Sequence, residues 1–341
     1  MKLLLIKTSS LGDVLHALPA LTEARARIPA LTCDWVVEEA YADIPAWHPA
    51  VGSVLPVAIR RWRRAPFAAW RSGEAGQFLS RLRAQRYDCV LDAQGLLKTA
   101  PVTLLARGPR VGLDRRSARE GLASFCYDRT VPVDRREHAV ERLRTLFAAA
   151  LGYAPSPAPP DYGIDRGRLP VPSETGDYLV FLHGSTWASK LWPDAHWRAL
   201  LARAGQAGLK VLLPFGTPDE QHRAEALAQG HPHARVLPPL RLPQLAATLA
   251  AARAVVGVDS GPTHLASALG VPTVSIYGAT DPTLTGTWGA RQHRAQAAFP
   301  CAPCLKRVCP LPADNSLHPP CYGALDADAV WASLETLRWA A

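Results

Sequence analysis

The sequence predicts two doubly wound α/β domains joined by a proline-rich linker. Short apolar runs without alternation, typical of parallel strands buried on both faces, alternate with helical stretches. This alternation occurs twice, on either side of a segment that reads A-P-S-P-A-P-P-D-Y-G at 154–163. A chain of 341 residues, 48% of them hydrophobic, can build a separate core in each half.

The first half begins with a strand and a polar turn. The run K-L-L-L-I-K at 2–7 predicts a central buried strand, and T-S-S-L-G-D at 8–13 leads into a helix at 14–27. We expect residues 1–155 to form the first domain, followed by a linker at 156–176. Further strands are expected at 34–38, 54–57, 87–93 and 111–113, and helices at 71–86, 96–107 and 137–151.

The second half repeats the alternation, and we expect residues 177–325 to form the second domain. The last helix, within 326–341, could cross back to the first domain. In paired doubly wound domains that face each other, the ligand-binding ends of the two sheets share one cleft. Strands are expected at 178–183, 210–215, 254–258 and 271–277, and helices at 195–207, 218–229, 263–269 and 327–339.

A polar turn follows the strand at 254–258, and its residue types suit an anion. A free helix N-terminus at the carboxyl end of a parallel strand binds phosphate through its N–H groups. The alternative is that the hydroxyls only cap the helix and the histidine only packs. The residues of this turn are Asp259, Ser260, Gly261, Pro262, Thr263 and His264.

Polar turns also follow the first strand of each half. Asp13 lies in the opening turn of a helix, where a carboxylate usually caps the helix and interacts with its dipole. Asp13 could instead be a general base that accepts a proton from an incoming hydroxyl. In the second half, the turn at 183–186 precedes Lys190, which is either a surface lysine or a cation that neutralises a departing phosphate. Neither turn has the glycine pattern of a kinase-type phosphate loop or a dinucleotide site.

The charge of the chain indicates an anionic partner. The formal net charge is +9, and the segment I-R-R-W-R-R-A-P-F-A-A-W-R at 59–71 concentrates arginines without an acidic residue. Charge runs are usually solvated, but the interleaved aromatic residues favour a partly apolar partner. Nucleic acid and lipid head groups both fit this pattern. The candidate contacts are Arg60, Arg61 and Arg63.

The apolar start of the chain stops at Lys7, and no apolar run approaches the ~18 residues of a membrane span. We therefore expect a soluble cytoplasmic protein. Seven cysteines, an odd number, argue against a disulfide framework. Four of them form the pattern C-x2-C-x4-C-x11-C, which either holds a structural zinc or consists of reduced thiols in a loop. These four are Cys301, Cys304, Cys309 and Cys321.

Several motifs together resemble those of the lipopolysaccharide heptosyltransferases, the type I enzymes most closely. The resemblance spans nearly the whole chain, and its N-terminal and V-D-S-G-x-x-H motifs are specific in combination. The matching stretches are K-T-S-S-L-G-D-V-L-H-A-L-P-A-L at 7–21, D-W-V-V-E-E at 34–39, V-A-I-R-R-W-R-R at 57–64, D-A-Q-G-L-L-K at 92–98, A-R-E-G-L-A-S at 118–124, H-A-V-E-R at 138–142 and V-D-S-G-P-T-H-L at 258–265.

The resemblance implies a GT-B glycosyltransferase fold with two facing Rossmann-like domains. It implies inverting transfer of heptose from ADP-L-glycero-D-manno-heptose to the inner 3-deoxy-octulosonic acid (Kdo) of Kdo-lipid A. No metal or other cofactor would be needed for catalysis. The enzyme would be a monomer at the cytoplasmic face of the inner membrane, in peripheral contact with its anionic surface.

The same resemblance assigns roles to individual residues. Asp13 would be the general base, and Lys190 would stabilise the leaving diphosphate. Ser185 and Thr186, with the turn from Asp259 to His264, would bind the donor. The acceptor would contact Ser9, Ser10, Gly12, Arg60, Arg61, Arg63 and Arg119.

Two other functions compete with this one. A type II-like enzyme of the same fold would add heptose to an already heptosylated core, and the cysteine-rich loop is a feature associated with that type. A basic nucleic-acid-binding protein would explain the arginines. However, the sequence has no recognisable nucleic-acid module, and a binding role alone leaves Asp13 unexplained.

Overall fold

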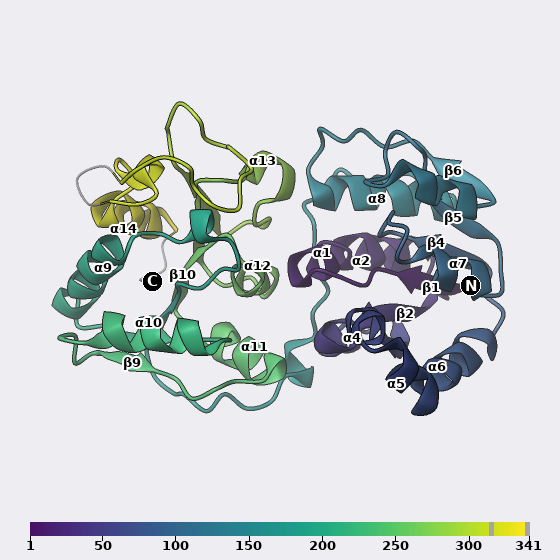
Figure 1. Ribbon diagram of the computed structural model, residues 1–341, viewed down its shortest axis with the longest axis horizontal. Helices are drawn as coiled ribbons and strands as arrows, with labels where there is room; N and C mark the ends of the chain where they lie inside the picture. Colours follow the sequence, from purple (N-terminus) through teal and green to yellow (C-terminus); the bar gives the residue numbers. More distant parts are fainter. Residues whose placement is uncertain (314–316, 338–341) are drawn as a thin grey trace. The chain divides into compact units, whose positions relative to one another are not determined.

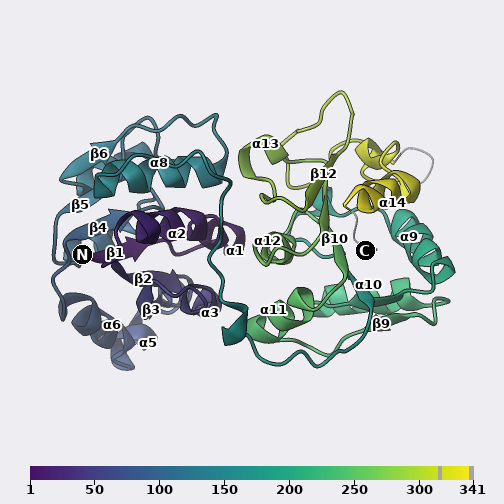
Figure 2. The same ribbon diagram turned by 180° about the vertical axis from the view of Figure 1, so that it is seen from behind.

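The computed structural model describes residues 1–313 and 317–337, with the side chains of Pro66, Ala68 and Trp70 left aside. The chain divides into two compact units, Met1–Asp165 and Arg166–Ala341. Each unit contains a six-stranded parallel sheet covered by helices (Figure 1, Figure 2). The predicted class, two α/β units with doubly wound sheets, is confirmed.

The sheet of the first unit has the strand order β3-β2-β1-β4-β5-β6. Its centre, β1 (Lys2–Ile6), pairs in parallel with β2 (Thr32–Glu38) and β4 (Cys89–Asp92). These strands are apolar without alternation because both faces of the sheet are covered. The outer strands are β3 (Val51–Val57), β5 (Arg110–Leu113) and β6 (Arg129–Val131).

Helices bury both faces of this sheet. Leu4 and Ile6 of β1 share one core cluster with Leu82 and Val102, which lie on α6 (Glu74–Arg83) and α7 (Ala100–Leu105). Two longer helices, α2 (Leu18–Arg27) and α8 (Ala139–Leu151), pack side by side (Figure 1). The shorter elements are α1 (Leu11–Leu15), η1 (Glu39–Tyr41), α3 (Asp43–Ala46), α4 (Ile59–Arg64), α5 (Pro66–Arg71) and η2 (Gly121–Cys126).

The sheet of the second unit has the order β12-β11-β10-β7-β8-β9. When the strands are numbered from the start of each unit, both sheets have the order 3-2-1-4-5-6. Its strands are β7 (Tyr178–Leu182), β8 (Lys210–Leu213), β9 (Ala234–Val236), β10 (Ala254–Val258), β11 (Thr273–Tyr277) and β12 (Gln292–Gln296). Its helices are η3 (Arg166–Arg168), η4 (Ala188–Lys190), α9 (Asp194–Gln206), α10 (Pro218–Ala228), α11 (Leu242–Ala250), α12 (Gly261–Ala268), α13 (Pro282–Thr285), η5 (Pro320–Tyr322) and α14 (Ala327–Thr336).

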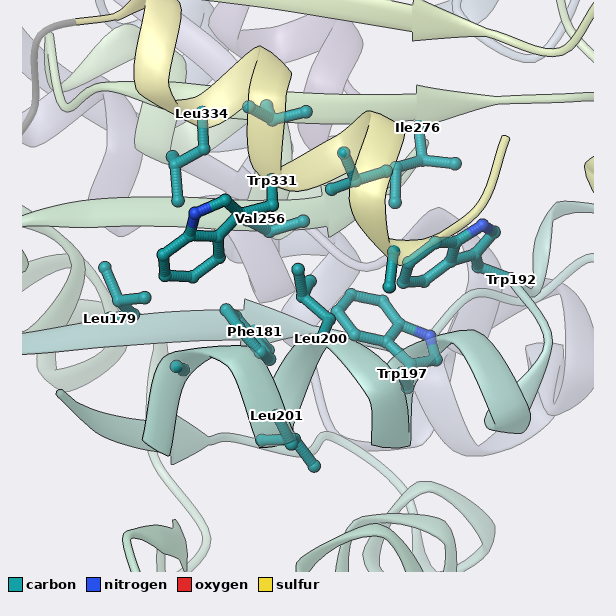
Figure 3. Packing of buried hydrophobic residues seen from close by; sticks show 14 of the residues in the cluster. Leu179, Phe181, Trp192, Trp197, Leu200, Leu201, Val256, Ile276, Trp331 and Leu334 are labelled. Atoms are coloured by element: carbon teal, nitrogen blue, oxygen red, sulfur yellow. The ribbon is translucent and has the colours of Figure 1, made fainter. Parts of the chain in front are cut away.

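The core of the second unit is built around tryptophans. The ring of Trp197 lies 5.0 Å from the ring of Trp192 and 5.5 Å from that of Phe181, measured between centroids. Trp331 and Leu334 of α14 enter the same cluster (Figure 3). The described part of the C-terminal segment therefore packs on the second unit, because its apolar residues are buried there. Residues 338–341 of that segment lie outside the described residues.

The proline-rich segment expected as a linker at 156–176 is held at both ends. Arg144 is buried, and its guanidinium donates to the carbonyls of Ser156 and Ala158 and to a carboxylate oxygen of Glu23. The unit boundary falls at 165–166. After it, the Arg166 guanidinium donates to the Leu269 carbonyl of the second unit. None of the described helices is long and apolar enough to cross a membrane.

Candidate functional site

In each unit, the chain reverses its direction of winding between the first and fourth strands, β1 and β4 in one and β7 and β10 in the other. Open α/β sheets bind ligands at this position, outside the carboxyl ends of the strands. Most of the candidate site residues expected from sequence follow three of these strands, β1, β7 and β10. The two half-sites are therefore equivalent places in two sheets of the same winding.

Asp259, which follows β10, is the centre of the half-site in the second unit. Its Oδ2 lies 2.7 Å from the Lys190 ammonium and accepts a hydrogen bond of 2.5 Å from the Thr280 hydroxyl. Its Oδ1 lies 3.4 Å from Nε2 of His264. The Asp259 carboxylate is therefore contacted by three side chains from three different loops or helices.

Asp259 is ionised in these surroundings. Burial alone would raise the pKa of its carboxyl, but the hydrogen bond with His264 and the charge of Lys190 outweigh burial. The net result is a pKa well below the usual range. Because the ammonium has three donors, Lys190 can hold Asp259 and still donate to a second anion.

The turn that begins α12 combines half-buried and fully buried residues. Ser260, Gly261 and Pro262 are half-buried, whereas Thr263 is fully buried. The Thr263 hydroxyl donates to the Val258 carbonyl at 2.6 Å and lies 3.1 Å from the Ser260 hydroxyl. Thr263 therefore locks the strand-to-helix turn, and only the first residues of the turn present polar groups.

The loop after β7 carries Ser185, Thr186 and Lys190. Thr186 is exposed and Ser185 is half-buried, with its hydroxyl 3.5 Å from the Asp259 carbonyl. The Lys190 ammonium lies 4.6 Å from the centroid of the Trp187 ring, and the Arg307 guanidinium lies 5.5 Å from it. Two cations on one indole make this loop strongly electropositive.

The four C-terminal cysteines line one cavity of about 110 Å³. Burial, together with the charges of the other three thiols, raises the pKa of Cys321 to about 11. Among the residues that the structure describes, no three His, Cys, Asp or Glu side chains are arranged to hold a metal ion. The thiols are therefore neighbours without forming a ready ligand set.

This cysteine loop is attached to the half-site. The Ser189 hydroxyl donates to the Lys306 carbonyl at 2.5 Å, and the Ser189 N–H donates to the Arg307 carbonyl. The Leu305 N–H donates to the Ala279 carbonyl, next to Thr280. The position of Arg307 beside Trp187 therefore depends on this loop.

Asp13 is the centre of the half-site in the first unit. Its Oδ2 accepts hydrogen bonds from both the N–H (2.7 Å) and the hydroxyl (2.9 Å) of Ser10, which is the cap of α1. Within 1–313 and 317–337, no hydrogen bond is made to Oδ1. One oxygen of Asp13 therefore caps the helix, and the other is available to a ligand. Gly12 is buried behind them.

Two lysines lie beside this turn. The Lys98 ammonium donates to the Ser9 hydroxyl at 2.5 Å, and burial followed by the charge of Arg60 lowers the Lys98 pKa. The Lys7 ammonium is buried and donates to the Ala93 carbonyl; burial lowers its pKa, while the charge of Asp13 opposes that shift. Both lysines place positive charge close to Asp13.

The turn is held in place from β4. Gln94 Oε1 accepts from the N–H groups of Thr8 and Ser9, at 2.8 and 3.1 Å. Asp92 is fully buried and accepts from the Gln94 N–H and from the hydroxyls of Thr99 and Tyr127. Burial raises the Asp92 pKa, and the hydrogen bonds partly offset this effect.

The four candidate arginines have different surroundings. Arg61 is bound by Glu39 (2.9 Å) and Glu74 (2.8 Å), and these hydrogen bonds raise its pKa. Arg60 and Arg63 are exposed, and the Arg60 N–H donates to Glu38. Arg119 is exposed and near enough to Lys7 to lower its pKa. Arg61 is therefore already neutralised by carboxylates, unlike the other three.

Sequence reasoning missed several side chains at these half-sites. Gln94 and Lys98 lie within a matching motif, but nothing in the sequence pairs them with Ser9. In the sequence, only its position after a strand distinguishes Thr280 from other threonines. Trp187 could have been found, because it directly follows Thr186 in the predicted phosphate-binding turn.

Comparison with known proteins supplies the family. The model of glycosyltransferase family 9 (heptosyltransferase) matches residues 76–313. Lipopolysaccharide heptosyltransferase 1 of Pseudomonas aeruginosa is 50% identical over 347 residues, covering 99% of this chain and 98% of that protein. The protein of the same name from Escherichia coli K12 is 48% identical over 299 residues, covering 87% of this chain and 94% of that protein.

A solved structure, E. coli heptosyltransferase WaaC with ADP, has a TM-score of 0.87 at 43% identity, and the match covers 99% of this chain and all of that one. WaaC is a GT-B glycosyltransferase, so the expected GT-B fold is confirmed. The expected enzyme class is confirmed as well. The chain is a glycosyltransferase that belongs to glycosyltransferase family 9, the heptosyltransferases.

Proposed function

We propose that this chain is a type I lipopolysaccharide heptosyltransferase, which transfers L-glycero-D-manno-heptose from ADP-heptose to the inner Kdo of Kdo-lipid A. The observation that carries the proposal is the difference in identity between types. The type 1 proteins of Pseudomonas aeruginosa, Escherichia coli and Salmonella typhimurium are 48–50% identical, whereas heptosyltransferase 2 of Salmonella typhimurium is 25% identical over 303 residues. A structure of E. coli WaaC with ADP-2-deoxy-2-fluoro heptose, 43% identical, supports ADP-heptose as the donor.

The donor diphosphate would bind at the half-site of the second unit. Lys190 carries the charge, and its position is set by Asp259 at 2.7 Å. The hydroxyls of Ser185 and Thr186 and the first turn of α12 would supply neutral donors. Such cations and N–H groups stabilise the negative charge that develops on ADP as the glycosidic bond breaks.

Asp13 would be the general base. Ser10 fixes the carboxylate through Oδ2, which leaves Oδ1 to accept the proton of the attacking Kdo hydroxyl. Attack on the anomeric carbon from the side opposite to ADP gives inversion in one step. The base then supplies proton transfer and Lys190 supplies charge stabilisation, so the mechanism requires no metal ion.

The acceptor carries carboxylates and phosphates, which suit the cations of the first unit. Arg60, Arg63, Arg119 and Lys98 are the groups that have charge to offer there. Arg61, which binds Glu39 and Glu74, would chiefly hold α4 in place. We place the enzyme at the cytoplasmic face of the inner membrane, where a lipid-linked acceptor is accessible.

The four cysteines could form a structural zinc site after a small closure of their loop, since all four line the same cavity. Measurement of zinc released from purified protein by a thiol-reactive reagent tests this. One zinc per chain, lost in Cys304→Ser, supports the site. Protein purified with zinc in the medium but free of bound zinc would contradict it.

The acceptor assignment is tested by comparing two acceptors at saturating ADP-heptose. We expect kcat/KM for Kdo-lipid A to exceed that for a heptosylated Kdo-lipid A by at least ~100-fold, because the extra sugar blocks the attacking hydroxyl. The reverse preference would identify a type II enzyme. Equal values would mean that the acceptor is neither of these two.

A further inference from the structure

We propose that an apolar surface formed by α7 and η2 of the first unit inserts into an anionic lipid bilayer. This inference deepens the proposed function and rests on it only for the identity of the lipid-linked acceptor. We call it the α7–η2 surface. Its members are the exposed apolar side chains of Leu97, Leu104, Leu105, Leu122 and Phe125.

These side chains are far more exposed than apolar residues of a core helix. Leu104 is 50% exposed and Phe125 is 74% exposed. The opposite sides of the same elements are buried, since Val102 belongs to the core of the unit and Ala123 is fully covered. The apolar residues therefore form an outer face of α7 and η2 and do not result from poor packing of the core.

The two elements that carry these residues, α7 and η2, pack against each other. The Leu97 N–H donates to the Glu120 carboxylate at 2.6 Å, and the Glu120 N–H donates to the Gly95 carbonyl. Leu104 lies on α7, and Leu97 lies in the turn that precedes this helix. Single exposed apolar residues are ordinary, but a contiguous group of this kind marks a binding surface.

The charges around this surface select an anionic partner. Arg107, Arg115, Arg116 and Arg119 are exposed, and in the described part of the chain none of them forms an ion pair. The nearby carboxylates have partners: Asp114 accepts from the N–H groups of Arg116 and Ser117, Glu120 accepts from the Leu97 N–H, and Asp128 pairs with Arg110. Leucine and phenylalanine surrounded by unpaired arginines is the pattern of an interfacial membrane contact.

The position of the surface also favours a membrane over a soluble partner. Leu97 precedes Lys98, whose ammonium binds Ser9 beside Asp13. A bilayer that contacts the α7–η2 surface would therefore lie next to the half-site where the head group of a lipid-linked acceptor would bind. The same elements would fix both the lipid surface and the reacting sugar.

The test measures binding to vesicles that contain neither ADP-heptose nor Kdo-lipid A, so it is independent of the proposed reaction. Full-length protein is sedimented with vesicles of phosphatidylcholine alone or with 30% phosphatidylglycerol. We expect binding to the anionic vesicles. The double variant Leu104→Ser with Phe125→Ser should lower the partition coefficient at least ~10-fold. Val171→Ser, which removes a more exposed apolar side chain elsewhere, should leave it unchanged.

A second variant separates charge from insertion. Arg115→Gln with Arg116→Gln should weaken binding to anionic vesicles and abolish its dependence on phosphatidylglycerol. Unfolding curves of each variant must match the wild type.

Failure of the wild type to bind either vesicle would overturn the proposal and leave the surface to a protein partner. Unchanged partitioning of the Leu104 and Phe125 variant would overturn it too. Vesicle binding without transfer to Kdo-lipid A would count against the proposed function alone.

Discussion

The two carboxylate oxygens of Asp13 have different surroundings: Oδ2 holds Ser10, and no described residue donates to Oδ1. Asp13→Asn separates the two roles, since the amide oxygen can still cap α1 but cannot act as a base. We expect kcat to fall by at least ~100-fold while ADP affinity, measured by calorimetry, stays unchanged. Asp326→Asn, at the N-cap of α14 in the second unit, is the matched control. A kcat near wild type for Asp13→Asn would leave Asp13 with the capping role only.

Lys190 is tied to Asp259 in a nearly buried pair, so its loss has two effects. Lys190→Met removes the cation that we propose binds the diphosphate, and it leaves the Asp259 carboxylate without its lysine partner. We expect Kd for ADP to rise at least ~10-fold and the free energy of unfolding to fall by about 3 kcal/mol. Lys210→Met, at an exposed lysine, should change neither. If ADP binding survived Lys190→Met, the diphosphate would have to be held elsewhere.

His183 makes stability depend on pH. It is fully buried, and neither ring nitrogen has a hydrogen-bond partner in 1–313 and 317–337. Burial, followed by the charge of Arg223, lowers its pKa to about 4. As pH falls from about 6.5, the unfolded chain takes up a proton that the folded chain refuses, so stability is lost between about pH 6.5 and 4.

We therefore expect His183→Leu to remove about 3 kcal/mol of this acid-dependent loss of unfolding free energy. Urea unfolding at a series of pH values compares the variant with the wild type. His222→Leu, at an exposed histidine of α10, is the control. Parallel profiles for wild type and His183→Leu would mean that His183 ionises freely in the folded protein.

At the scale of elements, α4 shows how neighbouring arginines acquire different roles. Arg63 is exposed and has no carboxylate partner in the described part of the chain, whereas Arg61 bridges Glu39 and Glu74. We expect Arg63→Ala to raise the acceptor KM several-fold without affecting the donor KM. Arg61→Ala should lower the thermal midpoint of the protein, because α4 loses its ion pairs, and should change both KM values little. Steady-state kinetics with each substrate varied in turn measures the split, and an equal effect of Arg63→Ala on both KM values would point to general damage.

The long apolar elements could be predicted from sequence and the polar ones could not. β1, β10 and α9 follow directly from their patterns. The strands β6, β9 and β12 were missed because they are short or polar: β12 reads Q-H-R-A-Q and finds its place only by pairing with β11. No helix was expected at 59–64, where α4 forms and where Arg61 pairs with acids supplied by η1 and α6.

At the half-sites, sequence located the turns but not the side chains that complete them. Asp259, Lys190 and Asp13 lie in recognisable turns after strands. The side chains that complete these turns are distant in sequence. Thr280 lies 21 positions from its partner Asp259, and Lys98 lies 89 positions from its partner Ser9. Such pairings depend on strand order, which a single sequence does not reveal. The buried Thr263 hydroxyl likewise required the structure to separate locking of the turn from ligand binding.

At the scale of the whole molecule, two units of the same winding carry complementary chemistry. The first presents a carboxylate beside lysines and arginines, and the second presents a lysine held by a carboxylate. In the proposed mechanism the first unit would activate the acceptor and the second would stabilise the leaving group, so neither unit would catalyse the reaction alone. The net charge of +9 suits two anionic substrates and an anionic surface.

The most direct test of this account is ADP release from ADP-heptose in the presence of EDTA, with and without Kdo-lipid A. We predict release that depends on the acceptor, continues at the same rate in EDTA, and is abolished by Asp13→Asn. Release that requires added divalent metal would contradict the assignment of leaving-group stabilisation to Lys190. Failure of Kdo-lipid A to stimulate any release, with ADP-heptose still bound, would contradict the acceptor and the type I assignment.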